Sequence, residues 1–168
     1  MHLSIVIPTY NESSRIINTL DVLANYLVDK NNDCEIIISD DGSTDNTRDQ
    51  VSIWINRSRR SNVYVSLISS SHKGKGAAVK RGMLKATGHY RIMFDADLAM
   101  LPSYIDKFID NMDQGYDVVI ASREISGARR FDEPYMRHLM GRIFNYYVRI
   151  FFVNSYQDTQ CGYKCFTS

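Results

Sequence analysis

Short apolar runs alternate along this chain with longer segments whose apolar residues recur at helical spacing. The apolar runs predict strands at residues 3–7, 35–39, 63–68, 90–94 and 118–121. The helical spacing predicts helices at residues 13–28, 44–57, 76–86, 102–112 and 135–152. This alternation is typical of an α/β fold with three layers, in which helices cover both faces of a mainly parallel sheet.

Polar segments directly follow four of the predicted strands. In folds of this class, ligands bind beyond the carboxyl ends of the strands. We therefore expect the four segments to form one site at that edge of the sheet. They are residues 8–12, 40–45, 69–76 and 95–97.

The pair Asp95 and Asp97 follows the apolar run at residues 90–94. If the strand continues through both, their side chains point to the same side with Cα atoms about 7 Å apart. Two like charges so close need a cation or a proton to neutralise them. Oxygen ligands suit Mg²⁺ or Mn²⁺, which commonly bridge carboxylates and substrate phosphates. The pair predicts a metal that grips a diphosphate, and the alternative is a solvated pair in a turn.

The first two polar segments offer groups for a nucleoside. Glu12 lies near a predicted helix start, where negative charge is favoured, and Tyr10 could stack on a base. Because adjacent side chains of a strand point oppositely, one of Asp40 and Asp41 should face the ligand and accept from a base or a ribose. Ser43 or Thr44 can cap the helix that follows.

Basic residues follow two other strands. The segment 71–76 joins glycines to Lys73 and Lys75 before a helix, a combination that favours phosphate binding, although it matches neither a Walker nor a dinucleotide motif. Its alternative is a solvated turn. Arg123 follows the fifth predicted strand, which would hold its guanidinium in place for a phosphate. For Arg137 and its neighbours, ordinary surface charge is the alternative.

Composition limits the remaining choices. A chain of 168 residues with 44% hydrophobic residues and a net charge of +1 fits one globular domain and gives no argument for nucleic-acid binding. Three cysteines without a second metal-ligand pair predict reduced thiols in a cytosolic protein rather than disulfides or a zinc site. The start of the chain lacks the features of a signal peptide, and no run of 18 apolar residues occurs.

The segment 135–152 has the longest helical pattern, with basic residues placed between its apolar positions. It predicts either a helix packed against the core or a basic amphipathic surface that rests on a membrane or a lipid chain.

Taken together, the motifs resemble those of family-two glycosyltransferases, which have the Rossmann-like GT-A fold. The residues that carry this resemblance are Ser4-Ile5-Val6-Ile7-Pro8-Thr9-Tyr10-Asn11-Glu12, Asp40-Asp41-Gly42-Ser43-Thr44-Asp45, Lys73-Gly74-Lys75-Gly76-Ala77-Ala78-Val79, Arg81-Gly82-Met83 and Asp95-Ala96-Asp97. Ala121-Ser122-Arg123 and Asp158-Thr159-Gln160-Cys161-Gly162-Tyr163-Lys164 make it most similar to the branch of dolichyl-phosphate glucosyltransferases, with polyprenyl-phosphate mannosyltransferases as relatives.

The resemblance implies an inverting transferase that moves a hexose from a nucleotide sugar to a polyprenyl or dolichyl phosphate. UDP-glucose is the favoured donor and GDP-mannose the alternative, and the enzyme would lie at the cytoplasmic face of a membrane as a peripheral protein. Its site residues would be, for the nucleotide sugar, Pro8, Tyr10, Glu12, Asp40, Asp41, Lys75, Asp95 and Ala96; for Mg²⁺ or Mn²⁺, Asp95 and Asp97; for the acceptor phosphate, Arg123, Arg137 and Gln160; and for catalysis, Asp97, Asp158 and Arg123.

Two departures from the family pattern refine this expectation. Ala99 stands where the mannosyltransferases often have a polar side chain, which favours the glucosyl branch or a water ligand there. Family members usually continue beyond the position of Phe166, so we expect residues 1–168 to be one catalytic domain without a C-terminal extension.

Other functions remain open alternatives. The nearest is a transferase of the same fold that acts on a saccharide of an envelope polymer, where Asp158 would be the first candidate for a general base. A protein that binds nucleotide sugars without turnover is the non-enzymatic alternative. A nucleotidyltransferase would need a glycine-rich loop after the first strand, and the carboxylates of a glycosidase would have to lie on both sides of a sugar.

Overall fold

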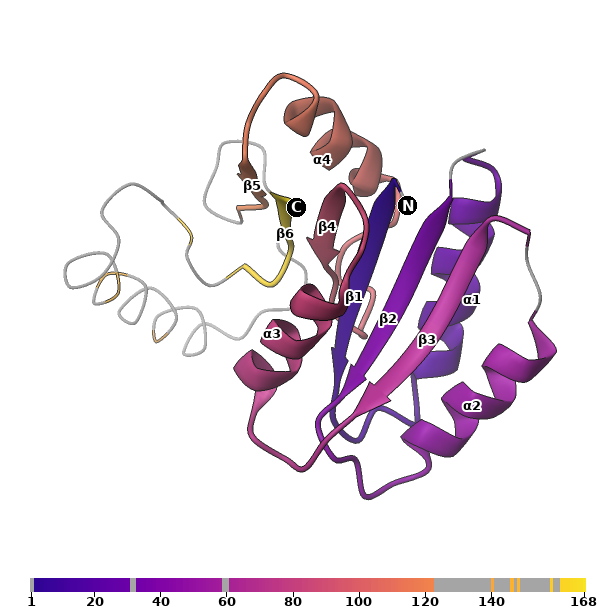
Figure 1. The fold of residues 1–168 in the computed structure, drawn as a ribbon. Coiled ribbons are helices and arrows are strands. Elements are labelled where there is room, and N and C mark those ends of the chain that lie inside the picture. The colour runs from indigo at the N-terminus through magenta and orange to yellow at the C-terminus, as the bar shows by residue number, and fades with distance from the viewer. Residues whose placement is uncertain are drawn as a thin grey trace. The chain divides into compact units, whose positions relative to one another are not determined.

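The computed structural model describes residues 2–30, 33–58, 61–122, 140, 146, 148, 158 and 161–168. The strands are β1 (Leu3–Thr9), β2 (Cys34–Asp40), β3 (Val63–Ser69), β4 (Tyr90–Met93), β5 (Val118–Ile120) and β6 (Lys164–Thr167). The helices are α1 (Ile16–Val28), α2 (Thr47–Arg57), α3 (Lys75–Lys85) and α4 (Tyr104–Met112). Each strand and helix predicted up to residue 121 is present, with its ends shifted by a few residues (Figure 1).

The sheet has the strand order β3-β2-β1-β4-β6-β5. The β1–β2, β1–β4 and β2–β3 pairs are parallel, which confirms the predicted α/β class. The sequence analysis missed β6, which pairs antiparallel with β4 and separates it from β5. A four-residue segment has too little periodicity to stand out in the sequence, and its strand conformation depends on the partner that it finds.

The strands form the centre of the core because helices cover both faces of the sheet. The side chains of Ile36, Ile37 and Ile38 are fully buried, which is typical of a central parallel strand. Figure 1 shows α3 on the near face of the sheet and α1 on the far face. A Cβ atom on Gly82 of α3 would lie 2.3 Å from Val6 Cγ1, so glycine lets this helix approach β1 closely.

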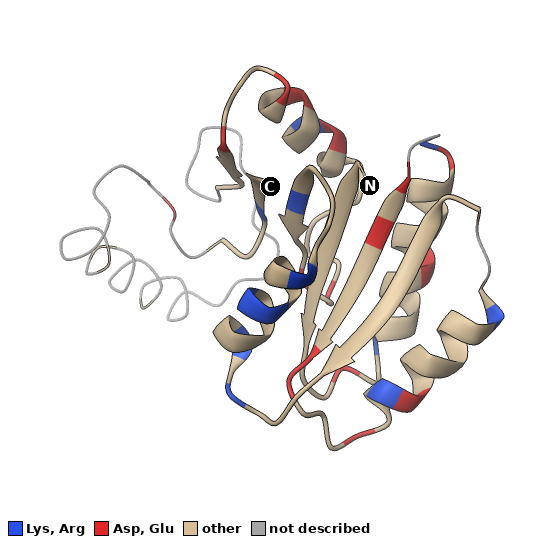
Figure 2. Ribbon diagram, in the orientation of Figure 1, with Lys and Arg blue, Asp and Glu red and all other residues tan. Residues whose placement is uncertain are grey.

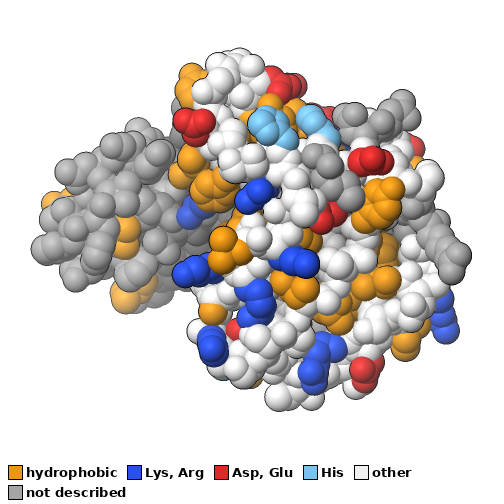
Figure 3. Space-filling model, in the orientation of Figure 1, with side chains coloured by type: hydrophobic (Ala, Val, Ile, Leu, Met, Phe, Trp, Pro, Cys, Tyr) orange, Lys and Arg blue, Asp and Glu red, His pale blue; other side chains and the backbone are white. Residues whose placement is uncertain are grey.

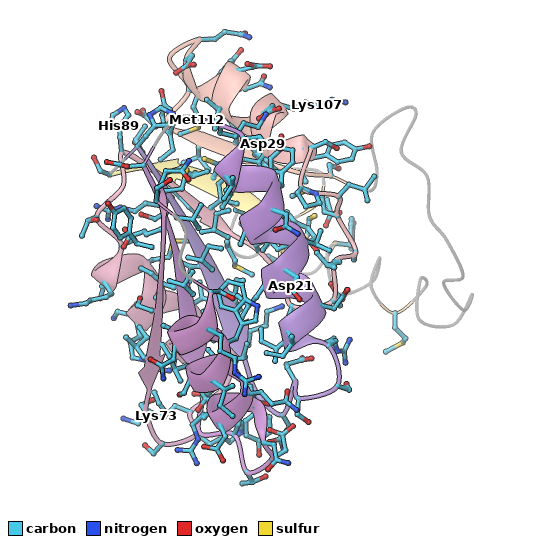
Figure 4. All side chains as sticks on the ribbon, turned by 90° about the vertical axis from the view of Figure 1, so that its right-hand side faces the viewer. Asp21, Asp29, Lys73, His89, Lys107 and Met112 are labelled. Carbon is cyan, nitrogen blue, oxygen red and sulfur yellow. The ribbon has the colours of Figure 1, made fainter. Side chains whose placement is uncertain are left out.

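The register of the parallel strands brings their last residues together. Thr9 is paired with Asp40, and Asp40 with Ser69, so β1, β2 and β3 end at the same level. We call this side of the sheet, with the loops that follow β1, β2, β3 and β4, the carboxyl edge. Lys73 lies at this end of the molecule, and His89 and Met112 lie at the opposite end (Figure 4).

The chain divides into two compact units, one of Met1–Val119 with Tyr163–Ser168 and one of Ile120–Gly162. Of the helix predicted at residues 135–152, Met140, Tyr146 and Val148 are described, and each is helical. Whether that helix packs on a core or forms a membrane surface stays a prediction. Among the described residues, no helix is both long and apolar enough to cross a lipid bilayer. Cys34, Cys161 and Cys165 are all buried.

Candidate active site at the carboxyl edge

The loops after β1 and β2 are joined by Asn11, which has a left-handed backbone with φ of 56°. Its side-chain oxygen accepts hydrogen bonds from the backbone N–H groups of Thr44 at 2.8 Å and Asp45 at 3.3 Å. Its own N–H donates to Ser43 Oγ at 2.9 Å. The sequence analysis gave Asn11 no role, because nothing local indicates a partner more than 30 residues away.

Asp45 lies just before α2 and connects the start of this helix to the loop after β1. Its carboxylate accepts hydrogen bonds from the N–H groups of Ser13 at 3.1 Å and Thr47 at 3.0 Å. Burial opposes ionisation of this carboxyl, but hydrogen bonds from Thr47 and Ser13 outweigh it and lower its pKa to about 2. The predicted cap by Ser43 or Thr44 is wrong, because Asp45 bonds to the first residue of the helix.

Asp40 ends β2 and organises the turn after it. Its fully buried carboxylate accepts hydrogen bonds from the N–H groups of Gly42 and Ser43, each at 3.1 Å, and from Ser69 Oγ at 3.0 Å. Arg48 Nε lies 3.9 Å from Oδ2 of Asp40, the oxygen that accepts these three hydrogen bonds. These contacts give Asp40 a structural role, and its predicted contact with the nucleotide sugar is not tested by them.

Asp41 connects the end of β2 to the loop after β3. Its carboxylate accepts the N–H groups of Lys73 at 3.1 Å and Gly74 at 2.7 Å, and it lies 2.8 Å from Nδ1 of His72. Burial opposes ionisation, but the hydrogen bonds from Lys73 and Gly74 prevail and lower the pKa of Asp41. Asp40 and Asp41 thus have different partners within the protein, and the contact of either with a ligand stays a prediction.

An aromatic pair lies beside Asp41. The rings of Tyr10 and His72 have centroids 4.2 Å apart and planes inclined by 31°. Tyr10 is 43% exposed. A base could therefore reach its side chain from the solvent. His72 was not predicted as a site residue. Gly42 allows this approach, since a Cβ there would lie 2.8 Å from the backbone nitrogen of His72.

The acidic pair follows β4 but does not continue it. The strand ends at Met93, Ala96 and Asp97 form a turn, and Leu98 has a left-handed φ of 54°. The extended geometry predicted for the pair is therefore wrong. The turn is tied to α1, because Thr19 Oγ1 donates to the carbonyl of Ala96 at 2.6 Å.

Cationic groups gather next to this turn. Lys75 Nζ donates to Asp95 Oδ1 at 2.6 Å, and Lys75 begins α3. All the charged residues of this helix are basic (Figure 2). The start of this helix thus brings the ammonium group of Lys75 against the carboxylate of Asp95. An anion and a cation bound together would match both halves of this charge pattern.

The donor atoms fit a hard divalent cation. Asp95 and Asp97 offer carboxylate oxygens, and the ammonium group of Lys75 shows that a positive charge is favoured at Asp95. Within the described ranges, His, Cys, Asp and Glu side chains nowhere gather in threes or more with an arrangement that could hold a metal ion. A cation at the pair would take its other ligands from phosphate oxygens and water, as Mg²⁺ commonly does.

Tyr163, near the end of the sequence, contacts the acidic turn through its hydroxyl group. Its hydroxyl accepts the N–H of Met100 at 3.1 Å and lies 3.4 Å from Asp97 Oδ1, to which it donates. Burial, with the charge of Asp97, raises the pKa of Tyr163, so the hydroxyl keeps its proton. The sequence analysis quoted Tyr163 only within a motif, and without β6 nothing indicated that it would meet Asp97.

The remaining predicted residues divide into described and undescribed positions. Pro8 is buried within β1, and Glu12 pairs with Arg15, whose Nε lies 2.6 Å from Glu12 Oε2. Asp158 belongs to the second unit, where it is buried and accepts the N–H of Cys161 at 3.1 Å. The three residues predicted to bind the acceptor phosphate lie outside the described residues, and they are Arg123, Arg137 and Gln160.

Comparison with known proteins gives the family. The model of the family described as "Glycosyl transferase family 2" matches residues 4–167. The chain belongs to this family. The motif resemblance is thereby confirmed, and it covers nearly the whole chain.

Two curated relatives illustrate the match. A dolichyl-phosphate beta-glucosyltransferase of Dictyostelium discoideum is 33% identical over 178 residues, covering 99% of this chain and 54% of the relative. A dolichol-phosphate mannosyltransferase of Pyrococcus furiosus is 33% identical over 144 residues, covering 84% of this chain and 39% of the relative. The chain thus spans about half the length of the first of these relatives and a smaller part of the second.

A solved structure supports the fold. Glucosyl-3-phosphoglycerate synthase from Mycobacterium tuberculosis, in complex with Mn²⁺ and UDP-glucose, superposes with a TM-score of 0.68 at 20% identity. The match covers 99% of this chain and 56% of that one. The predicted GT-A fold, a mixed α/β sandwich with a mostly parallel sheet, is confirmed.

Proposed function

We propose that this chain is the catalytic part of an inverting, metal-dependent glycosyltransferase that moves glucose from UDP-glucose to dolichyl or another polyprenyl phosphate. The observation that carries the proposal is the turn of Asp95 and Asp97 beside Lys75 at the carboxyl edge. The name of the Dictyostelium relative supports glucose and a dolichyl acceptor, and GDP-mannose is the alternative donor suggested by the Pyrococcus relative.

In this proposal the site holds the donor by its two ends. Tyr10 and the loops held by Asp41 face the nucleoside, while Lys75 and the start of α3 face the diphosphate. Asp95 and Asp97 would hold Mg²⁺ or Mn²⁺, and the solved structure with Mn²⁺ and UDP-glucose supports a divalent ion in this fold. Such an ion would supply charge neutralisation for the leaving diphosphate.

The acceptor phosphate is already ionised near neutral pH, so the site has little need of a strong general base. We assign its binding to Arg123 with Arg137 and Gln160, and the shaping of the reacting end to Asp158. Their task is positioning, since an oriented nucleophile reacts far faster than a free one. A saccharide acceptor would need a base, and an acceptor screen therefore separates the two functions.

We further place the protein at the cytoplasmic face of a membrane as a peripheral protein. The outer side of α3 carries Lys80 and Lys85 next to Leu84, which is 75% exposed. Figure 3 shows basic side chains over the face where α3 lies. A basic surface with an exposed apolar side chain suits anionic lipid head groups.

The decisive experiment measures product from UDP-glucose and GDP-mannose with dolichyl phosphate or an oligosaccharide, with and without Mn²⁺ or Mg²⁺. We expect glucosyl transfer to the lipid phosphate only when the metal is present. In Asp97→Ala the rate should fall about 100-fold or more, because several kcal/mol of charge stabilisation are lost. The melting temperature should fall only slightly, since Asp97 is exposed and loses its hydrogen bonds with Ala99 and Tyr163 alone among the described residues.

Three results would contradict the proposal. Unchanged turnover in Asp97→Ala would remove the metal role. Transfer to the oligosaccharide alone would identify the saccharide-transferring alternative. Metal-dependent binding of the donor by calorimetry, with no product from any acceptor, would identify a binding protein.

A further inference from the structure

We propose that Tyr163 is a positioning residue that orients Asp97 toward the bound cation. The inference rests on the proposed function, because it assigns Tyr163 a role at the same site. Tyr163 itself would touch neither the substrate nor the metal ion, and it would act only through the carboxylate of Asp97.

The contacts of the hydroxyl carry the proposal. It lies 3.4 Å from Asp97 Oδ1 and accepts the N–H of Met100 at 3.1 Å, so both its donor and its acceptor capacity are used. The tyrosine is 6% exposed, and its ring packs edge-on against Phe94 with centroids 5.1 Å apart. A buried ring with both hydrogen bonds made has one orientation, and this fixes the direction of its donor.

Asp97 needs such a partner because of where it lies. It is an exposed side chain in a turn, just before the left-handed residue Leu98. The N–H of Ala99 reaches the same oxygen, Oδ1, at 3.0 Å. Among the described residues, both donors reach Oδ1, and we assign the other oxygen of Asp97 to the cation. Groups that hold a metal ligand in this way commonly set metal affinity and activity.

The topology explains why a residue from the end of the chain reaches this turn. Strand β6 runs antiparallel to β4, and Lys164 is paired with Met93. The residue before β6 is therefore next to the residues after β4, which places Tyr163 beside the acidic turn. The pairing of β6 with β4 thus places the hydroxyl of Tyr163 at Asp97.

The test compares two buried tyrosines at opposite ends of the β4–β6 pair, whose hydroxyl groups donate to different carboxylates. Tyr163→Phe removes the hydroxyl that reaches Asp97. Tyr90→Phe is the matched control, since Tyr90 is also 6% exposed and its hydroxyl donates to Asp113, which lies away from the acidic turn. Binding of Mn²⁺ is measured by electron paramagnetic resonance in the presence of UDP and, separately, GDP, and thermal melting is recorded for each variant.

We expect Tyr163→Phe to weaken Mn²⁺ binding about 10-fold or more, as is usual when a partner of a metal ligand is lost. The affinity of Tyr90→Phe for Mn²⁺ should stay within about twofold of that of wild type, because Asp113 is not a predicted metal ligand. Both variants should melt at a lower temperature, so melting alone would not distinguish the two roles. The change in metal affinity would.

Two outcomes overturn the assignment while leaving the proposed function intact: Tyr163→Phe binds Mn²⁺ as wild type does, or both variants lose affinity equally. If wild type binds no Mn²⁺ with either nucleotide, the proposed function fails at its metal site and the role of Tyr163 fails with it. The wild-type measurement thus tells the two failures apart.

Discussion

At the scale of single residues, charges at the carboxyl edge are balanced by partners from other loops. Lys75 is the first residue of α3, where the helix dipole disfavours a positive charge. Its ion pair with Asp95 offsets this cost. A divalent cation would compete with the ammonium group for Asp95, and a diphosphate would attract the ammonium group away. Metal and diphosphate should therefore bind better together than apart.

Lys75→Met tests this coupling. Without the competing ammonium group, Mn²⁺ alone should bind several-fold more tightly, while UDP should bind about 10-fold more weakly because a charge-assisted contact is lost. Isothermal titration calorimetry measures both affinities. Lys80→Met is the control, since Lys80 is an exposed residue of the same helix. Equal affinities in wild type and Lys75→Met would rule out the exchange.

A second residue-scale prediction concerns acid stability. The pKa of Asp45 is about 2, below its unfolded value, so its stabilisation is complete above pH 3.8 and is lost as pH falls toward 2. Asp45→Ala should lower the melting temperature by about 2–6 °C at pH 6, because the N–H groups of Ser13 and Thr47 lose their acceptor. The difference from wild type should shrink between pH 3.8 and pH 2. Asp49→Ala, at an exposed position of α2, serves as the control.

A difference that stays constant down to pH 2 would contradict this account. It would mean that the carboxylate of Asp45 is not what holds the loops after β1 and β2.

At the scale of secondary structure elements, the position of α3 depends on one glycine. Gly82 faces Val6, a fully buried and β-branched residue of β1. The helix can therefore lie close to the sheet, and Ser39 Oγ donates to the carbonyl of Ala78 at 2.7 Å. This close packing fixes the start of α3, and with it Lys75, beside the acidic turn.

Gly82→Ala should lower the free energy of unfolding by about 1–3 kcal/mol, as overpacking does, although alanine favours helices. Its added Cβ would meet Val6 Cγ1 at 2.3 Å. Gly76→Ala in the same helix meets nothing within 4 Å and should be neutral or stabilising by about 0.4–1 kcal/mol. Urea denaturation measures both. If both variants were equally stable, close packing at Gly82 would not be the reason for its glycine.

At the scale of the whole molecule, the three thiols report on the integrity of the fold. Burial raises the pKa of Cys34 to about 11 and that of Cys165 to about 12. Cys161 is also buried. A thiol that is both inaccessible and protonated reacts slowly, because the thiolate is the nucleophile.

Labelling with Ellman's reagent at pH 8 should therefore be slow in the native protein and rapid for all three thiols in guanidinium chloride. The yield of released thionitrobenzoate against time measures both rates. Native labelling as fast as in denaturant would show that the thiols are accessible, contrary to their burial. A labelled fraction of one third would identify a single exposed cysteine, which mass spectrometry of the labelled peptides would locate.

The sequence by itself determined the alternation of strands and helices and the edge where the candidate site lies. Apolar periodicity is a local property, and strands joined through β-α-β units run parallel, so the loops after them lie at one edge. The acidic pair, the lysines of 71–76 and the paired Asp40 and Asp41 could therefore be selected before their neighbours were known. The family followed from the same segments.

Only the tertiary structure decided which groups these residues meet. Asp41 holds the loop after β3, Lys75 pairs with Asp95, and Tyr163 reaches Asp97. None of these contacts has a local signal, because the partners are 20 to 66 residues apart. Strand β6 likewise exists because β4 offers a free edge for antiparallel pairing. Hydrogen bonds depend on distances of a few tenths of an ångström, and only the packed chain sets such distances.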